Sequence, residues 1–202
     1  TLPPSTGSGF LVTADGHIIT NNHVTNGCSY VTGSIGGKLY NLDVLASDTA
    51  NDLSLLYSAE LRGVPVNFRS SSILLGEEIW VAGYPFGDNL SSTIKLTKGI
   101  VSSLSGIQND YTKFQLDAAM QPGNSGGPVF SSEGHLLGVS VYKLDETYAK
   151  ESFGVTPENT NFAINTQVVQ MFLAANGIVV RKGAPTTTDI ASLAQKVTIF
   201  IG

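Results

Sequence analysis

A serine between glycines is the first group in this chain whose setting suggests covalent chemistry. Ser125 stands in the string Gly123-Asn124-Ser125-Gly126-Gly127, where glycines on both sides let the backbone turn tightly and approach a substrate carbonyl. In such a turn the amide N–H groups of Gly123 and Ser125 can converge on one point, and donors placed in this way stabilise the oxyanion of an acyl-transfer intermediate. The string therefore predicts an exposed serine nucleophile beside an oxyanion hole formed by Gly123, Asn124 and Ser125.

A serine hydroxyl is a weak nucleophile, so this chemistry requires a neighbouring base. Of the three histidines, His23 lies where the apolar pair Ile18-Ile19 gives way to polar residues, and a strand end of this kind presents a side chain to a cleft. His17 and His135 each follow a turn that ends in glycine, and we expect both to be solvated. His23 is therefore the predicted general base.

The imidazole in turn needs an acceptor for its second nitrogen, and a buried carboxylate serves best. Asp52 stands immediately before the hydrophobic run Leu53-Ser54-Leu55-Leu56, so its side chain can be drawn inward with that run. Asp117 is the main rival, but it lies shortly before Ser125 and is expected to support the serine loop. The remaining candidates are expected to be turn or cap residues: Asp43 and Asp48. The sequence thus predicts a catalytic triad of His23, Asp52 and Ser125.

Short apolar runs between turn signals supply the strands that must position these residues. Residues 9–13 and 17–20 flank Asp15-Gly16, a strong hairpin signal, and residues 128–130 and 135–141 flank a second polar turn that ends in Gly134. Further strands are expected at residues 38–45, 53–56, 78–82, 93–104 and 113–116. This spacing indicates an all-β sandwich or barrel with about ten to twelve strands in two groups.

One helix is expected after the last of these strands. Asn165 or Thr166 can cap it, apolar residues between 168 and 173 form one face, and Gly177 can end it. These signals place the helix at about residues 166–176. The end of the chain has the pattern of a short helix near 189–196 and a strand near 197–201, to which the sequence assigns no function.

Composition excludes several classes of protein. The chain has 202 residues, a net charge of −5 and 11 scattered Lys and Arg residues, so it offers no basic stripe for nucleic acid. Its longest apolar stretches fall far short of the roughly 20 residues that span a bilayer. Cys28 is the one cysteine and has no partner for an internal disulfide. The chain begins at Thr1 without an apolar leader, as expected of a processed product whose export signal is not visible.

Three blocks around the predicted triad resemble those of the HtrA/Deg branch of the trypsin-like serine peptidases. Their order along the chain, His then Asp then Ser, is also the chymotrypsin order. The resemblance covers residues 7–177, and further matching segments lie between the triad blocks and after them. The blocks and segments are Thr20-Asn21-Asn22-His23-Val24, Asn51-Asp52-Leu53-Ser54-Leu55-Leu56, Asp117-Ala118-Ala119-Met120-Gln121-Pro122-Gly123-Asn124-Ser125-Gly126-Gly127-Pro128, Gly83-Tyr84-Pro85-Phe86-Gly87, Thr97-Lys98-Gly99-Ile100-Val101-Ser102 and Asn161-Phe162-Ala163-Ile164.

The resemblance implies two packed six-stranded antiparallel β-barrels of the chymotrypsin type with a short C-terminal helix and the active site between the barrels. It also implies hydrolysis of peptide bonds through an acyl-enzyme, without a metal or an organic cofactor. We expect a protease domain at residues 1–183, with the barrel boundary near 88–92, and a tail of unknown role at 184–202. Family members usually carry a PDZ domain after the protease, and we expect this chain to lack one.

In the resembling fold, the residues before the nucleophile and the strand after the second hairpin line the primary specificity pocket. Here these residues are Ala119, Met120, Ser140, Val141 and Tyr142. Ala119 lies six residues before Ser125, where a carboxylate would select Lys or Arg, so we expect a small to medium apolar P1 residue instead. By the same resemblance, the partners are unfolded or exported proteins, the location is periplasmic or secreted, and a homo-oligomer is compatible with the sequence.

Two other readings remain open at this stage. The first is a protease-shaped module that binds an extended peptide by strand addition and turns over negligibly. The three triad residues argue against it, because a pure binder has no physical need for all of them. The second is a glutamyl endopeptidase, which shares the Gly-Asn-Ser-Gly loop and would differ in its P1 pocket, where His135 is the weakly supported candidate.

Overall fold

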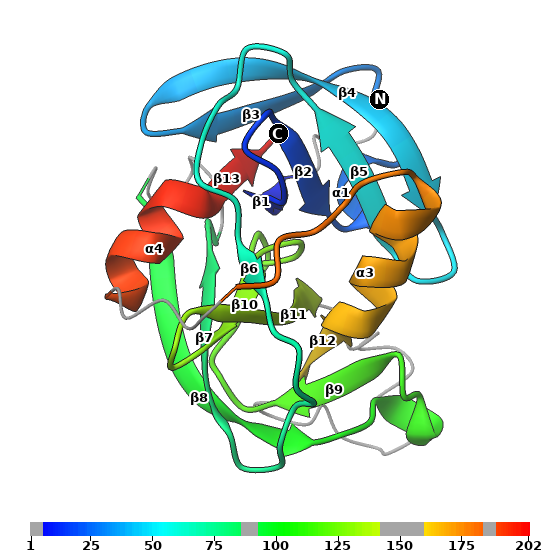
Figure 1. The fold of residues 1–202 in the computed structure, drawn as a ribbon, viewed down its shortest axis with the longest axis vertical. Helices are drawn as coiled ribbons and strands as arrows, with labels where there is room; N and C mark the ends of the chain where they lie inside the picture. The colour runs from blue at the N-terminus through cyan, green and yellow to red at the C-terminus, as the bar shows by residue number, and fades with distance from the viewer. Residues whose placement is uncertain (1–5, 86–92, 142–159, 184–188) are drawn as a thin grey trace.

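The computed structural model describes residues 6–85, 93–141, 160–183 and 189–202, and these residues form two closed β-barrels (Figure 1). The first barrel has the strand order β1-β13-β3-β4-β5-β2. Its strands are β1 (Gly7–Leu11), β2 (His17–Thr20), β3 (Val31–Ile35), β4 (Lys38–Asp48), β5 (Leu53–Tyr57) and β13 (Thr198–Ile201).

The second barrel has the order β10-β7-β8-β9-β12-β11 and closes where β10 pairs with β11. Its strands are β7 (Glu78–Gly83), β8 (Lys95–Ser103), β9 (Lys113–Leu116), β10 (Pro128–Ser131), β11 (His135–Val141) and β12 (Asn161–Asn165). A short strand, β6 (Asn67–Phe68), pairs in parallel with the first two residues of β11. Two six-stranded antiparallel barrels are therefore confirmed. The expected boundary between them, near 88–92, lies outside the described residues.

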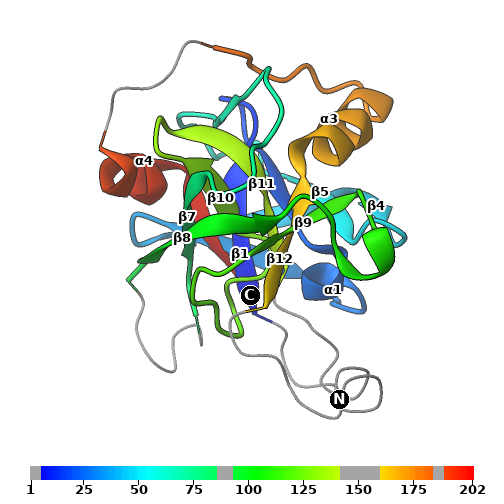
Figure 2. The same cartoon turned by 90° about the horizontal axis from the view of Figure 1, so that it is seen from below.

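Helices flank the barrels or form single turns at their edges. The helices α3 (Thr166–Ala175) and α4 (Ile190–Val197) lie on opposite sides of the molecule (Figures 1 and 2). Asn165 accepts a hydrogen bond from the Gln167 amide at 3.1 Å, so the predicted cap and the predicted helix after β12 are both observed. The shorter pieces are α1 (Asn22–Thr25) and the 3₁₀ turn η2 (Ile107–Asn109).

The Asp15-Gly16 hairpin connects β1 and β2 as expected. Gly16 has a φ of 107°, a conformation that a side chain disfavours. A Cβ on Gly16 would also lie 2.2 Å from the Ser58 carbonyl oxygen. Both the turn and the packing therefore require glycine at this position.

Apolar side chains from the two barrels meet in a shared core. Phe10, Ile19 and Leu55 of the first barrel pack in one cluster with Phe130 and Val139 of the second. Separate clusters fill the interior of each barrel. Because the shared cluster belongs to neither barrel alone, it fixes the position of one barrel against the other.

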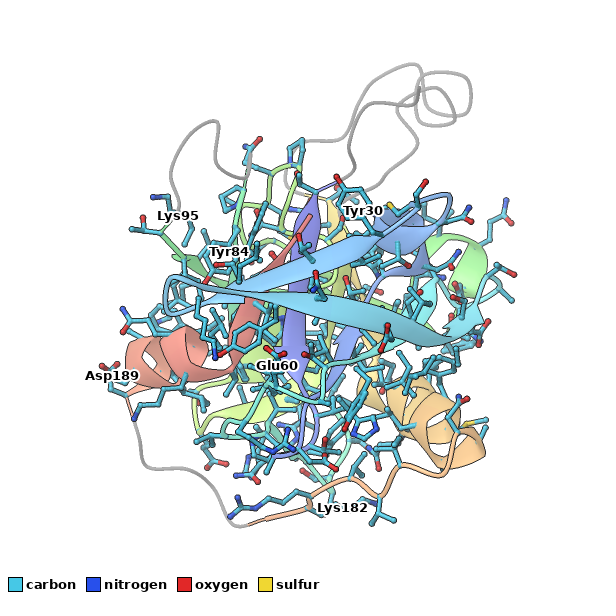
Figure 3. The ribbon with its side chains drawn as sticks, turned by 90° about the horizontal axis from the view of Figure 1, so that it is seen from above. Tyr30, Glu60, Tyr84, Lys95, Lys182 and Asp189 are labelled. Atoms are coloured by element: carbon cyan, nitrogen blue, oxygen red, sulfur yellow. The ribbon has the colours of Figure 1, made fainter. Side chains whose placement is uncertain are left out.

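The end of the chain completes the first barrel. Strand β13 lies between β1 and β3, with Ile201 opposite Gly7 and Phe200 opposite Ser34. Asp189, at the start of α4 (Figure 3), caps this helix by accepting from the Ala191 amide at 3.1 Å. The tail, to which the sequence assigned no function, thus contributes a helix and a barrel strand.

Among the described residues, no helix is long and apolar enough to cross a bilayer.

The position of β13 predicts a large effect from one buried side chain. Ile199 is fully buried in the interior of the first barrel, so Ile199→Ala should lower the free energy of unfolding by about 2–5 kcal/mol. Val179 is 90% exposed, and Val179→Ala should change it by less than about 0.5 kcal/mol. Urea denaturation of both variants measures this difference, and equal effects would show that β13 leaves the barrel in solution.

Candidate active site

His23 and Asp52 form a pair at the mouth of the first barrel. The His23 Nδ1 atom lies 2.7 Å from Asp52 Oδ2, and the His23 backbone N–H donates to Asp52 Oδ1 at 2.9 Å. Because an ionised carboxylate only accepts hydrogen bonds, the hydrogen of a neutral imidazole resides on Nδ1. The Nε2 lone pair is then available to accept a proton. The two side chains remain 29% and 25% exposed.

Local structure explains why this pair forms. Strand β2 ends at Thr20, and the single turn α1, which contains His23, contacts β5. Asp52 has a φ of 56°, a left-handed conformation that aspartate tolerates better than most residues. Its carbonyl oxygen accepts from the Asn21 side chain at 3.0 Å and from the Asn22 amide at 3.1 Å. These bonds fix the strained residue in place.

The turn before Asp52 is held by a second aspartate. Asp48 Oδ1 accepts from the backbone amides of Asn51 and Ala50 at 2.9 and 3.0 Å, and its Oδ2 accepts from the Asn51 side chain at 2.7 Å. The hydrogen bond from the Asn51 side chain, followed by that from the Asn51 backbone, lowers the pKa of Asp48 below its ordinary value of 3.8. Asp48 therefore ends β4 and caps the turn that follows, in agreement with the expected turn or cap role, and it orders the segment that presents Asp52.

Ser125 lies in a loop, residues 121–127, that we call the nucleophile loop. Ser125 is 4% exposed, so the prediction of an exposed serine is wrong. The reason is packing against the first barrel, where the Ser8 amide donates to the Ser125 carbonyl at 2.8 Å. Gly126 has a φ of 85°, and a Cβ there would lie 2.1 Å from the Ser8 carbonyl oxygen. Only glycine permits this approach.

Two of the three residues predicted for the oxyanion hole, Gly123 and Asn124, differ in how their amides are used. Gly123 has a φ of 98°, and no group among the described residues accepts from its N–H. The Asn124 amide instead donates to the Gln121 carbonyl at 3.0 Å, and Asn124 Oδ1 accepts from the Gln121 amide at 3.2 Å. Asn124 therefore shapes the loop, and Gly123 keeps an amide available for a ligand.

The residues predicted for the specificity pocket are placed in different environments. Ser140 is fully buried, and its hydroxyl donates to the carbonyls of Asn124 at 2.6 Å and Gly127 at 3.1 Å. Met120 packs in the interior of the second barrel. Ala119 is exposed, Val141 is largely buried, and Tyr142 lies outside the described residues. Ser140 thus supports the nucleophile loop.

The rival groups of the sequence analysis lie against other partners. Asp117 Oδ1 accepts from the Ile100 amide at 2.7 Å on β8, so its side chain is engaged by a neighbouring strand, and its expected support of the serine loop stays a prediction. His17 contacts Thr13 and Asp15 within its own hairpin. His135 is 5% exposed, so the expectation of a solvated side chain is wrong. Its Nε2 atom lies 3.3 Å from the Gly183 carbonyl oxygen, because the segment after α3 covers it.

Across residues 6–85, 93–141, 160–183 and 189–202, no group of three or more His, Cys, Asp or Glu side chains is arranged to hold a metal ion.

Two contributors to this site carry little signal in the sequence. Ser8 stands between two glycines at a strand start, and nothing local marks it as a contact of residues more than a hundred positions away. Asn21 reads as part of a polar loop, although its side chain holds the Asp52 carbonyl. Both roles arise from tertiary packing, and only the neighbouring triad blocks point to this part of the chain.

Comparison with known proteins agrees with this geometry. A family model described as a trypsin-like peptidase domain matches residues 7–139. An uncharacterized protein of Sinorhizobium fredii is 37% identical over 198 residues, which are 97% of this chain and 31% of that protein. Protease Do-like 1 of the Arabidopsis thaliana chloroplast is 31% identical over 91% of this chain and 44% of its own length.

Further similar proteins come from bacteria. A probable periplasmic serine endoprotease, DegP-like, of Hahella chejuensis is 36% identical over 75% of this chain and 33% of its own length. The crystal structure of a serine endoprotease from Yersinia pestis superimposes with a TM-score of 0.68 at 26% identity, covering 85% of this chain and 62% of that one. The chain spans less than half the length of these curated relatives.

The turn at Asp48 predicts a pH-dependent stability difference. Because the folded-state pKa of Asp48 lies below its ordinary value of 3.8, its stabilisation is complete above that value and is lost as the pH falls through the lowered pKa. Asp48→Ala should therefore destabilise the protein more at pH 6 than at about pH 3, since the stabilisation begins to be lost below 3.8. Urea denaturation at both pH values tests this.

Asp43→Ala is the matched control, because Asp43 is an exposed aspartate of the same strand, β4, and lies away from the turn. An Asp48→Ala effect of equal size at both pH values would contradict the role of the ionised carboxylate.

Proposed function

The chain belongs to the trypsin-like peptidase family, and from this premise we propose that it is a serine endopeptidase that cleaves peptide bonds through an acyl-enzyme. The observation that carries the proposal is the His23–Asp52 pair, with both carboxylate oxygens engaged by the same histidine residue. Such a pair orients an imidazole and stabilises the imidazolium that forms when it accepts a proton. The nucleophile loop with Ser125 supplies the group to be activated.

In the first half of the proposed reaction, Ser125 Oγ attacks the carbonyl carbon of the scissile peptide bond while His23 Nε2 takes the hydroxyl proton. The carbonyl oxygen becomes an oxyanion, and the amides of Gly123 and Ser125 donate to it. Donors of this kind act where charge develops in the transition state and contribute about a hundred- to a thousand-fold in rate. Collapse of the intermediate breaks the C–N bond, and His23 gives its proton to the leaving amine.

The second half repeats the same steps with water as the nucleophile. His23 Nε2 takes a proton from water as its oxygen attacks the acyl carbon, and the oxyanion again forms at the same amides. When the ester bond breaks, the proton passes from His23 to Ser125 Oγ. Asp52 remains ionised throughout, so it holds the ring in one orientation without exchanging protons.

We further propose that the substrates are unfolded or exported proteins and that P1 is a small or medium apolar residue. Support comes from Ala119, which places an exposed methyl group six residues before the nucleophile. A carboxylate that would pair with Lys or Arg is therefore missing from that position. The similar protein of Hahella chejuensis is periplasmic by its name, which supports a periplasmic or secreted location for this chain.

The first test is covalent labelling by a fluorophosphonate probe together with hydrolysis of unfolded casein. Both should occur in the unmutated protein and vanish in Ser125→Ala, because the probe and the substrate require the same hydroxyl. Asp52→Asn should lower kcat by about 10⁴-fold, since it leaves the imidazole in the wrong tautomer.

Asp117→Asn is the matched control, and it should retain most of the activity because Asp117 contacts β8. Absence of labelling in the unmutated protein would contradict the proposal and favour a peptide-binding module. A larger loss in Asp117→Asn than in Asp52→Asn would exchange the roles of the two aspartates.

Specificity is tested with a peptide library that varies only P1. We expect cleavage after Val, Ala and Leu at rates at least tenfold above those after Lys, Arg or Glu, because position 119 carries a methyl group that favours apolar contact and cannot pair with a charge. Mass spectrometry of the products locates each cut, and Ser125→Ala provides the blank. Strict cleavage after basic residues, or after Glu, would overturn the apolar assignment.

A further inference from the structure

Ser8 connects the two barrels at the nucleophile loop. Its amide donates to the Ser125 carbonyl at 2.8 Å, and its hydroxyl donates to the Gly123 carbonyl at 2.7 Å. The two acceptors lie on either side of Asn124, so one residue of β1 brackets the centre of the loop. Ser8 is fully buried and has no access to a substrate.

Every polar group of Ser8 is used at this junction. The hydroxyl also accepts from the Tyr84 amide at 2.9 Å, and the Ser8 carbonyl accepts from Thr20 Oγ1 at 2.7 Å. Thr20 ends β2, three residues before His23. Ser8 therefore contacts β2, the strand that leads to His23, and also the two loop carbonyls on either side of Asn124.

Gly123 needs an external constraint of this kind. Glycine has wide backbone freedom, and Gly123 has no side chain that could restrict its backbone to the observed φ of 98°. Within the described residues, the Ser8 hydroxyl is the group that donates to the Gly123 carbonyl. Holding this carbonyl fixes the plane of the peptide bond between Gly123 and Asn124. The Gly123 N–H belongs to the preceding peptide plane, which is joined to the fixed one at Cα. Its range of directions is therefore narrower than it would be with a free carbonyl.

We propose that Ser8 is a positioning residue for the oxyanion hole. Its hydroxyl, through the Gly123 carbonyl, sets the direction of the Gly123 amide, and its backbone amide, through the Ser125 carbonyl, sets the direction of the Ser125 amide. This inference rests on the proposed peptidase function and adds a residue outside the triad and the oxyanion hole. Ser8 acts on the transition state through the loop, so its loss should affect kcat and not substrate affinity.

The test compares Ser8→Ala with Ser131→Ala. Ser131 is a matched control because it is 2% exposed and its hydroxyl accepts from two backbone amides, those of Glu133 and His135, in the β10–β11 hairpin. Both variants lose a buried hydroxyl with two backbone partners, so a general loss of stability should appear in both. Only Ser8→Ala should disturb the nucleophile loop.

In Ser8→Ala we expect kcat and the fluorophosphonate labelling rate to fall by about ten- to a hundred-fold with KM changed less than about twofold, because a misdirected donor loses part of its contribution. Ser8→Cys keeps the size and a weak donor and should give an intermediate rate. Ser131→Ala should keep kcat within about twofold of the unmutated value. A kcat in Ser8→Ala equal to that in Ser131→Ala would overturn the proposal.

Hydrogen exchange provides a readout that does not depend on catalysis. Amides of residues 119–128 should exchange at least tenfold faster in Ser8→Ala than in Ser131→Ala, since the loop loses the bond from the Ser8 hydroxyl to the Gly123 carbonyl and keeps only the bond from the Ser8 amide. If the unmutated protein is inactive, the peptidase proposal fails while this measurement still decides the role of Ser8. Unchanged exchange in the loop would contradict that role even in an active enzyme.

Discussion

The proposed base and nucleophile lie on different barrels, so the site exists only while the nucleophile loop remains docked on β1. Two bonds from Ser8 join β1 to this loop: its amide donates to the Ser125 carbonyl at 2.8 Å, and its hydroxyl donates to the Gly123 carbonyl at 2.7 Å. The packing leaves no room for side chains here, since a Cβ on Gly7 would lie 2.6 Å from Val24 and 3.0 Å from the Ser125 carbonyl oxygen. Glycines on both sides of the junction thus serve the approach of the barrels as well as the local turns.

Polar groups buried at this junction are stable only because they are paired. Ser140 donates to two loop carbonyls, and Thr20 donates to the Ser8 carbonyl. A buried polar group without a partner would cost about 1–3 kcal/mol. Positions of the loop that break one of these bonds are therefore disfavoured by about this amount. The position of the nucleophile loop therefore depends on hydrogen bonds of serines and threonines that take no part in the proposed chemistry. The shared apolar core beneath them holds the barrels in register.

Local patterns predicted most of the strands, because they depend on neighbouring residues. Strand β9 lies at Lys113–Leu116, where the sequence placed it, and α3 ends one residue before the predicted limit. Strand β3 was not predicted, since Gly33 and its polar neighbours give a weak strand signal. The turn α1 was missed because four polar and β-branched residues resemble a loop. Burial of His135 and Ser125 was also missed, because it is produced by segments far away in the sequence.

The tail shows most clearly what a local pattern leaves open. The sequence predicted a helix and a strand near residues 189–201 from periodicity, but periodicity does not specify a pairing partner. In the structure, β13 places Phe200 opposite Ser8 on β1, and the Phe200 ring contacts that of Tyr84, with centroids 5.9 Å apart. Tyr84 donates its amide to the Ser8 hydroxyl. The last strand of the chain therefore packs directly against the residue that anchors the nucleophile loop, and the tail belongs to the support of the site.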